Sequence, residues 1–155
     1  MSDIGAIVTL TIFAAFAIAG AWWDARLRII PNWLNGAFLF AGLALVGVFS
    51  GWEMLLWSAA HFLAALVFAI VLFALKLWGG GDAKFYAAMA AWFPLRDFVP
   101  LFAGIALAGL FVVIGFLIAR RAIKTESHAK QLPYGIAIAL GGLVMQLSNH
   151  ADLFV

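Results

Sequence analysis

Apolar residues occur along this chain in long blocks that short polar stretches separate. A helix needs about 20 predominantly apolar residues to cross a bilayer, and most of the blocks approach that length. The fourth block has about 11 residues, which is about 16 Å of helix and too short to cross comfortably. The pattern predicts six transmembrane helices, of which the fourth is short. They cover residues 4–23, 33–49, 54–78, 83–93, 98–119 and 133–147.

The composition supports a membrane location. Of the 155 residues, 67% are hydrophobic and only 10% are charged, and the mean hydropathy is +1.13. A soluble domain of this length cannot bury so much apolar surface. We therefore expect an all-α integral membrane protein, with residues 1–155 forming a single polytopic domain.

The basic residues predict the orientation of the helices, because loops on the cytoplasmic side carry an excess of Lys and Arg. With the N-terminus outside and six crossings, eight of the nine basic residues fall on the inside, and only Arg96 falls outside. The inside set is Arg26, Arg28, Lys76, Lys84, Arg120, Arg121, Lys124 and Lys130.

Several classes of function are not supported by the sequence. The basic residues form short clusters, which does not favour nucleic-acid binding. The chain has no cysteine, and its three histidines have no metal-ligand spacing, so we expect no metal and no cofactor. His61 lies in the middle of the third block and is predicted to make a buried hydrogen bond to a neighbouring helix.

Two acids, Asp24 and Asp82, are predicted to lie at the same inner membrane face. Asp24 closes the first apolar block, and Asp82 opens the short fourth block directly after three glycines. Two interpretations are open. In the structural one, Asp24 pairs with Arg28 and Asp82 caps the fourth helix. In the functional one, ionisable residues at membrane depth mark a functional site.

The functional interpretation joins the two acids into a catalytic dyad. Two carboxylates brought close together do not both ionise readily, so they share a proton. One then acts as general base on a water, and the other as general acid towards a substrate carbonyl. The preceding glycines favour this hypothesis, because they allow a turn and the close approach of another backbone.

Three ordered motifs lie at the predicted ends of these segments. They are DARLRIIPNWL at 24–34, GGGDAK at 79–84 and LPYGIAIALGG at 132–142. Together they resemble the prepilin peptidases, the type IV prepilin leader peptidases of the GxGD aspartyl protease family. Gly79, Gly81 and Asp82 occupy the fixed GxGD positions. The larger members carry a cysteine-containing insertion and also methylate the new N-terminus. Because this chain has no cysteine, it resembles the short CpaA/TadV-like form.

The resemblance implies a membrane aspartic endopeptidase. Its substrates would be prepilins or pilin-like precursors, in which a short leader precedes a hydrophobic helix. Cleavage would occur at the cytoplasmic face of the bacterial inner membrane, with Asp24 and Asp82 as the catalytic pair. The expected partners are this precursor and the lipid bilayer.

Further residues of the motifs are candidates for supporting or substrate-binding roles. Lys84 is either an interfacial lysine or a charge near the site. Arg28 is either a membrane anchor or a partner of Asp24, and Asn32 is expected to cap the second helix. The turn of Pro133, Tyr134 and Gly135 resembles a substrate-facing element at the head of the last helix.

Three alternative functions remain open at this point. An archaeal-type preflagellin peptidase would use the same chemistry on another substrate. A small proton- or cation-coupled transporter subunit would bind ions at the broken fourth helix. A non-catalytic membrane scaffold would tolerate replacement of both aspartates.

Overall fold

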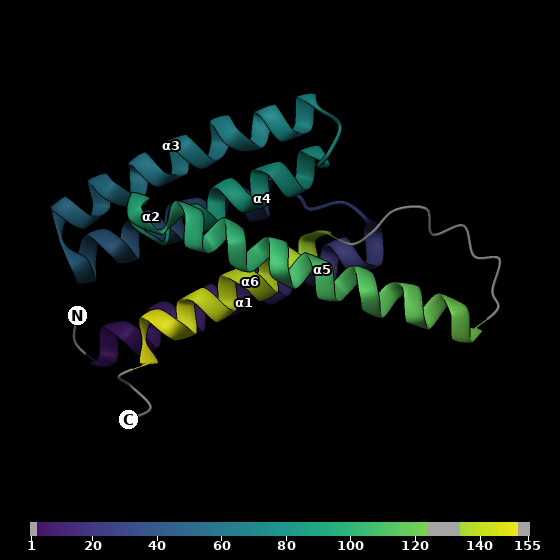
Figure 1. Ribbon diagram of the computed structural model, residues 1–155. Coiled ribbons are helices and arrows are strands. Elements are labelled where there is room, and N and C mark those ends of the chain that lie inside the picture. The colour runs from purple at the N-terminus through teal and green to yellow at the C-terminus, as the bar shows by residue number, and fades with distance from the viewer. Residues whose placement is uncertain (1–2, 124–133, 152–155) are drawn as a thin grey trace.

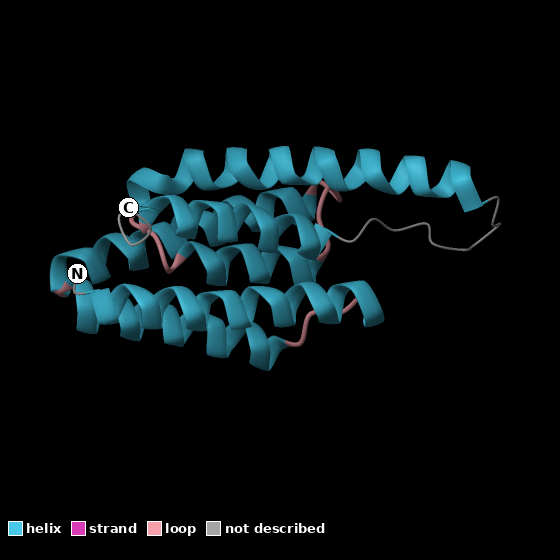
Figure 2. Ribbon diagram, turned by 90° about the horizontal axis from the view of Figure 1, so that it is seen from below, coloured by secondary structure: helices cyan, strands magenta, loops and turns pink. Residues whose placement is uncertain are grey.

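The computed structural model describes residues 3–123 and 134–151. In this part of the chain the protein is helical, with no strand, and its helices run side by side along a common direction (Figures 1 and 2). The elements are α1 (Asp3–Leu27), α2 (Asn32–Ser50), α3 (Trp52–Ala74), α4 (Gly80–Ala90), the 3-10 helix η1 (Leu95–Asp97), α5 (Phe98–Ile123) and α6 (Tyr134–Asn149).

The helix lengths confirm an all-α, multi-pass membrane protein. Four stretches of the described chain are long and apolar enough to cross a bilayer: α1, α2, α3 and the run Leu95–Gly115, which covers η1 and the first part of α5. The last helix, α6, is apolar but shorter, with 16 residues, and α4 has only 11. The count of six crossings and the outside N-terminus stay predictions.

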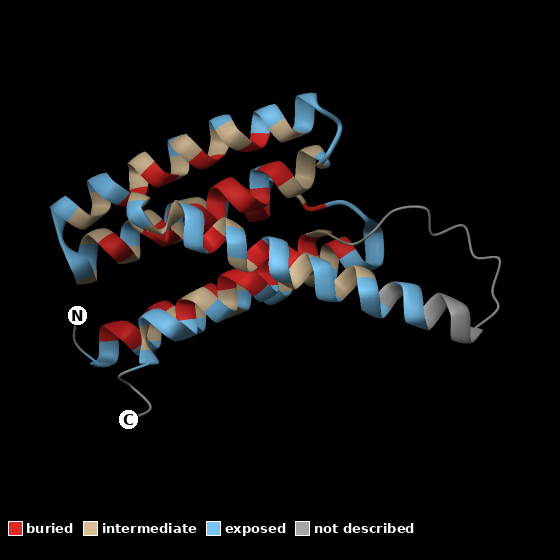
Figure 3. Ribbon diagram, in the orientation of Figure 1, coloured by how far each residue is buried: buried red, intermediate tan, exposed pale blue. Residues whose placement is uncertain are grey.

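The short helix α4 lies at the centre of the bundle, packed between α3, α2 and α6 (Figure 3). Every residue from 85 to 93 is buried. Over these nine residues the segment contacts protein on every side and leaves no face to lipid. Its length is explained in the same way, because a helix enclosed by protein does not need to match the bilayer thickness.

Three glycines on neighbouring helices make room for the large side chains of this central segment. Phe85 packs against Gly20 of α1, Met89 against Gly142 of α6, and Trp92 against Gly42 of α2. A Cβ atom at any of these glycines would collide with the side chain opposite. Trp92 also donates a hydrogen bond from Nε1 to the carbonyl of Phe38 at 3.0 Å. The position of α4 is therefore fixed by interlocking contacts on three sides.

His61 of α3 fixes the far end of this segment, as the sequence analysis expected. Its side chain is fully buried, and Nδ1 lies 3.0 Å from the carbonyl oxygen of Phe93, just beyond α4. A buried carbonyl at a helix end needs such a partner. The predicted buried hydrogen bond is confirmed, but its acceptor lies in the turn after α4 and not on a neighbouring helix.

Left-handed backbone conformations end the helices on either side of the candidate site. Arg28 has φ 56° and Lys76 has φ 61°. At the end of α3, the N–H of Leu77 donates to the carbonyl of Leu72, and that of Lys76 donates to Phe73, each at 2.9 Å. This is the Schellman pattern, here with lysine at the position that glycine usually takes. Both α1 and α3 therefore turn sharply, towards α2 and α4 respectively.

Several predicted boundaries differ from the observed ones; the third helix, for example, ends at Ala74 and not at residue 78, and two differences lie at the candidate acids. The first helix continues to Leu27, so Asp24 lies inside its last turn and does not close it. The fourth helix begins at Gly80 and not at Ala83, because the glycines themselves adopt helical geometry. Glycine destabilises a helix by its flexibility, so the sequence pattern did not indicate that α4 begins within the glycine run.

Candidate active site

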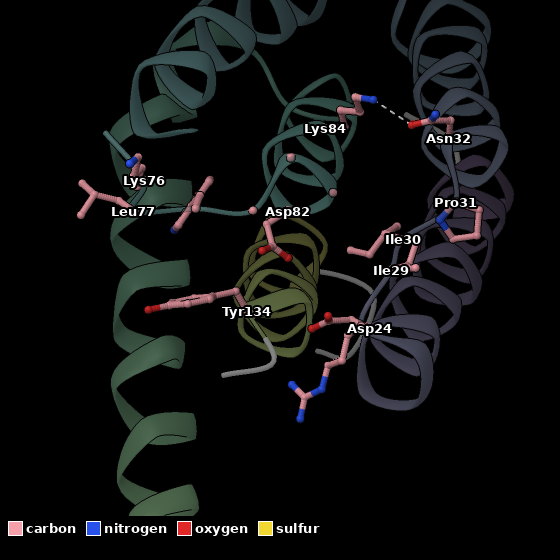
Figure 4. A pocket seen from close by; sticks show the side chains of 15 residues that line it. Asp24, Ile29, Ile30, Pro31, Asn32, Lys76, Leu77, Asp82, Lys84 and Tyr134 are labelled. Carbon is pink, nitrogen blue, oxygen red and sulfur yellow. Dashed lines mark hydrogen bonds between the residues drawn. The ribbon is translucent and has the colours of Figure 1, made fainter. Parts of the chain in front are cut away.

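A cavity of about 790 Å³ lies at the end of the bundle where α1 ends and α2, α4 and α6 begin. Both candidate acids line it, with the connection between α1 and α2 and the glycine run before α4 (Figure 4). Asp24 enters from α1 and Asp82 from α4, and the two carboxyl groups point into the same space. They are near enough for Asp24 to act electrostatically on Asp82. Residues 58 positions apart thus meet at one site.

Asp24 is held by the first turn of the last helix. Its side chain is buried, with the residue only 7% exposed, and its Oδ2 accepts a hydrogen bond from the backbone N–H of Gly135 at 2.8 Å. The first N–H groups of a helix have no partner within the helix, and they favour a negative charge. The carboxylate therefore lies at an N-terminus that suits an anion.

Gly135 leaves no room for a side chain at this contact. A Cβ atom there would lie 2.7 Å from the Cβ of Asp24 and 2.9 Å from its Oδ2. From the sequence, the turn at Tyr134 and Gly135 was predicted to face the substrate. Tyr134 does line the cavity, whereas Gly135 contacts the acid directly. Pro133 lies outside the described residues.

Asp82 is the third residue of α4 and folds back onto the glycine run. Gly79 occupies the N-cap position, and no side chain makes a capping hydrogen bond there. The backbone N–H of Gly79 faces the carboxylate, and a Cβ on Gly79 would lie 2.9 Å from Oδ2. This resembles the reach-back half of a capping box, in which the third residue of the helix contacts the cap. Asp82 is therefore not the N-cap residue of α4, contrary to the structural interpretation, although its carboxylate lies beside the Gly79 backbone at that position.

The motif glycines Gly79 and Gly81 do not have the positive φ angles that would require glycine. Gly79 has φ −75°, and neither Gly79 nor Gly81 is among the positive-φ glycines. At Gly81, a Cβ would lie 3.5 Å from the backbone nitrogen of Ile30 and 3.7 Å from its Cβ. The backbone of Ile30 thus lies at ordinary van der Waals distance from a Cβ on Gly81, and the turn before α4 is made without a positive φ.

The simple pairing of Asp24 with Arg28 is not observed. In residues 3–123 and 134–151, the one ion pair within 4.0 Å joins Arg96 and Asp97 at the other end of the bundle. Arg28 lines the cavity and acts on Asp24 as a nearby positive charge without direct contact. The structural interpretation therefore does not account for the place of Asp24.

Asn32 does not cap α2, contrary to expectation. The N-cap position is Pro31, with no side-chain hydrogen bond. Asn32 instead accepts a hydrogen bond at Oδ1 from Nζ of Lys84, 2.9 Å away on α4. Pro31 already supplies the extended residue that precedes the helix. The side-chain amide of Asn32 is therefore available for the hydrogen bond to Lys84.

Tyr86 is a feature of this region that the sequence analysis missed. It lies one helical turn beyond Asp82 and is fully buried against Phe68, Trp78 and Phe102. Its hydroxyl has no hydrogen-bond partner among the described residues. Residues four positions apart lie on the same face of a helix, so the spacing from Asp82 to Tyr86 could have placed Tyr86 near the acid.

The described residues contain no cluster of three or more His, Asp or Glu side chains that would hold a metal ion. The site instead offers two carboxylates, several cations and a cavity large enough for water and a polypeptide segment. Two facing carboxylates with a water between them can perform general acid–base hydrolysis of an amide.

Comparison with known families now adds a separate line of evidence. The family model for the type IV leader peptidase family matches residues 11–118, well over half of the chain. The chain belongs to the type IV leader peptidase family. This confirms the family expected from the motifs and makes the protein a peptidase. The matched range includes both acids of the peptidase and the pair formed by Asn32 and Lys84, but it ends before α6.

Neither a curated protein nor a solved structure shows significant similarity to this chain. The contact between Gly135 and Asp24 lies partly outside the family match, so it rests on the structure of the leader peptidase alone.

Proposed function

We propose that this leader peptidase is an aspartic endopeptidase that removes the leader of prepilins or pilin-like precursors. Asp24 and Asp82 are its catalytic pair, and a water between them is the nucleophile. The observation that carries the proposal is the convergence of these two acids, from α1 and α4, on one cavity (Figure 4). The family match supports the peptidase activity, and the geometry supports the choice of residues.

The surroundings of the two acids support a division of roles. Burial works against a charge on Asp24, but two interactions offset it: the carboxylate accepts the N–H of Gly135 at the start of α6, and the positive charge of Arg28 lies nearby. Both interactions favour the ionised form. We assign Asp24 as the general base and Asp82 as the protonated general acid.

The reaction then follows in two steps. Asp24 removes a proton from the water as its oxygen bonds to the scissile carbonyl carbon, and Asp82 gives its proton to the carbonyl oxygen. In the second step Asp24 passes its proton to the leaving nitrogen and the C–N bond breaks. One hydroxyl of the intermediate returns its proton to Asp82 as the carbonyl re-forms. Both acids regain their starting states, and no metal or covalent intermediate is needed.

The charges around the cavity support a cytoplasmic site in the bacterial inner membrane. Arg28, Lys76 and Lys84 all line it, and basic residues collect on the cytoplasmic side of membrane proteins. A leader that remains in the cytoplasm, followed by a helix in the bilayer, would bring its junction to this depth.

The decisive experiment is co-expression of the peptidase with a candidate prepilin, with the processed product followed by mass. Asp24→Asn and Asp82→Asn each keep the size of the side chain and remove the acid. We expect each variant to lose processing by at least about 1,000-fold, because each acid acts in the transition state. Asp97→Asn is the matched control, since Asp97 lies in η1 at the other end of the bundle, and it should process normally.

The proposed dyad would be wrong if both asparagine variants still removed the leader. Ion flux through liposomes that depends on Asp82, without any cleavage of precursor, would favour a transporter instead.

A further inference from the structure

The hydrogen bond between Lys84 and Asn32 closes one wall of the cavity. Nζ of Lys84 lies 2.9 Å from Oδ1 of Asn32, and both residues line the cavity with the two acids. The bond joins the first turn of α4 to the first residue of α2, which are 52 positions apart in sequence.

Lys84 is directed away from the carboxylates. Successive residues of a helix are about 100° apart, so Lys84 lies about 200° around α4 from Asp82. Figure 4 shows its side chain extending to Asn32, while the side chain of Asp82 points towards Asp24. Lys84 is also the exposed residue in a run that is otherwise buried from Ala83 to Phe93. Its ammonium group therefore binds Asn32 of α2 and is not directed at the two carboxylates.

A second polar contact also joins the α4 segment to α2. At the other end of the segment, Trp92 Nε1 donates to the carbonyl of Phe38 at 3.0 Å. Two attachments at opposite ends fix both the rotation of α4 and its position along α2. Apolar packing alone is less directional and does not set either quantity as sharply.

The connection to the other acid is short. Asn32 begins α2 directly after the turn that follows α1, and Asp24 lies in the last turn of α1. Within that turn, the backbone of Ile30 packs on Gly81. The chain from Asp24 to Asn32, the hydrogen bond to Lys84 and the first turn of α4 thus form a connected path from one acid to the other along the cavity.

We propose that Asn32 and Lys84 form a clasp that sets the position of Asp82 relative to Asp24. Lys84 is a positioning residue and does not bind the substrate. This inference rests on the proposed function, because it concerns the geometry of the same two acids. A misplacement of about 1 Å in a catalytic group is enough to lower a rate by up to about 100-fold.

The test is a double-mutant cycle on the processing of a prepilin by the full-length peptidase. Asn32→Leu keeps the volume and removes the acceptor, and Lys84→Met keeps the aliphatic stem and removes the charge. We expect each variant to lower kcat about tenfold with KM nearly unchanged, since substrate contacts stay intact. The double variant should be no worse than either single variant, because the same bond is lost in all three.

Two further variants separate positioning from general effects. Asn32→Asp keeps an acceptor for the lysine and should retain a kcat within about threefold of the parent. Lys76→Ala removes another cation of the cavity wall, and its effect should add to that of Asn32→Leu rather than merge with it. Melting temperatures in detergent show whether any variant has simply lost its fold.

The outcomes distinguish the clasp from the dyad. If Lys84→Met raises KM without changing kcat, or if the effects of Asn32→Leu and Lys84→Met add in full, Lys84 acts independently and the clasp is refuted. Such a result would leave the Asp24 and Asp82 proposal standing. Processing that survives Asp24→Asn and Asp82→Asn would instead refute the proposed function, whatever the cycle shows.

Discussion

The backbone N–H of Gly135 donates a 2.8 Å hydrogen bond to the carboxylate of Asp24 across 111 positions of sequence. The contact brings the first and last described helices together at the cavity. Because the glycine has no side chain, the acid lies directly on the helix backbone, where a larger residue would push it away. Two helix N-termini thus serve the site, that of α6 for Asp24 and that of α4 for Asp82.

Replacement of this glycine should impair processing strongly. In Gly135→Ala, the new Cβ would lie 2.7 Å from the Cβ of Asp24, so Asp24 or the head of α6 must move. We expect processing to fall by about 100-fold, mainly in kcat. The measurement is the initial rate of leader removal at saturating substrate. Gly104→Ala is the control, because its nearest contact, the carbonyl oxygen of Gly141, is at 3.8 Å; equal rates for the two variants would argue against the contact.

Two glycines of α2 should respond in opposite directions to alanine. In Gly42→Ala, the Cβ would lie 2.5 Å from Nε1 of Trp92, and this ring is held by its hydrogen bond to Phe38. Overpacking of this kind costs about 1–3 kcal/mol. A Cβ added at Gly36 would meet nothing within 4 Å, so Gly36→Ala should gain about 0.5–1 kcal/mol of helix stability. Unfolding in detergent measures both, and a stable Gly42→Ala protein would contradict the packing of Trp92.

The hydroxyl of Tyr86 provides a test of the buried core. It is enclosed by aromatic rings and has no partner among the described residues. An unsatisfied buried hydroxyl costs about 1–3 kcal/mol. Tyr86→Phe should therefore raise the free energy of unfolding by about 1 kcal/mol, as denaturation in detergent would measure. A loss of stability in this variant would mean that the hydroxyl makes a hydrogen bond within the folded peptidase.

Much of the fold was predictable from the sequence, because it depends on local information. The lengths of the apolar blocks predicted the helices, since a helix in lipid must satisfy its own backbone and cover it with apolar side chains. The motifs around Asp24 and Asp82 predicted the family and the two candidate acids. His61 also behaved as expected, since a histidine buried between helices must find a partner.

The sequence was less informative about how individual motif residues act. Asn32 looked like a cap because asparagine is a common one, but the preceding proline had already taken that position. Gly79 and Gly81 looked like a flexible turn, whereas neither has a positive φ, and a Cβ on Gly79 would lie against the carboxylate of Asp82. One residue type can have several structural roles, and the neighbouring sequence does not show which of them it has in the folded protein.

The sequence by itself thus determined an all-helical membrane protein and its family, and it pointed to two candidate acids. Only the tertiary structure decided that α4 is the buried centre of the bundle, that Gly135 supports Asp24 and that Lys84 binds Asn32. The physical reason is one of range. Hydrophobicity and helix length act between neighbouring residues, whereas these contacts join residues between 52 and 111 positions apart and exist only when whole helices have packed.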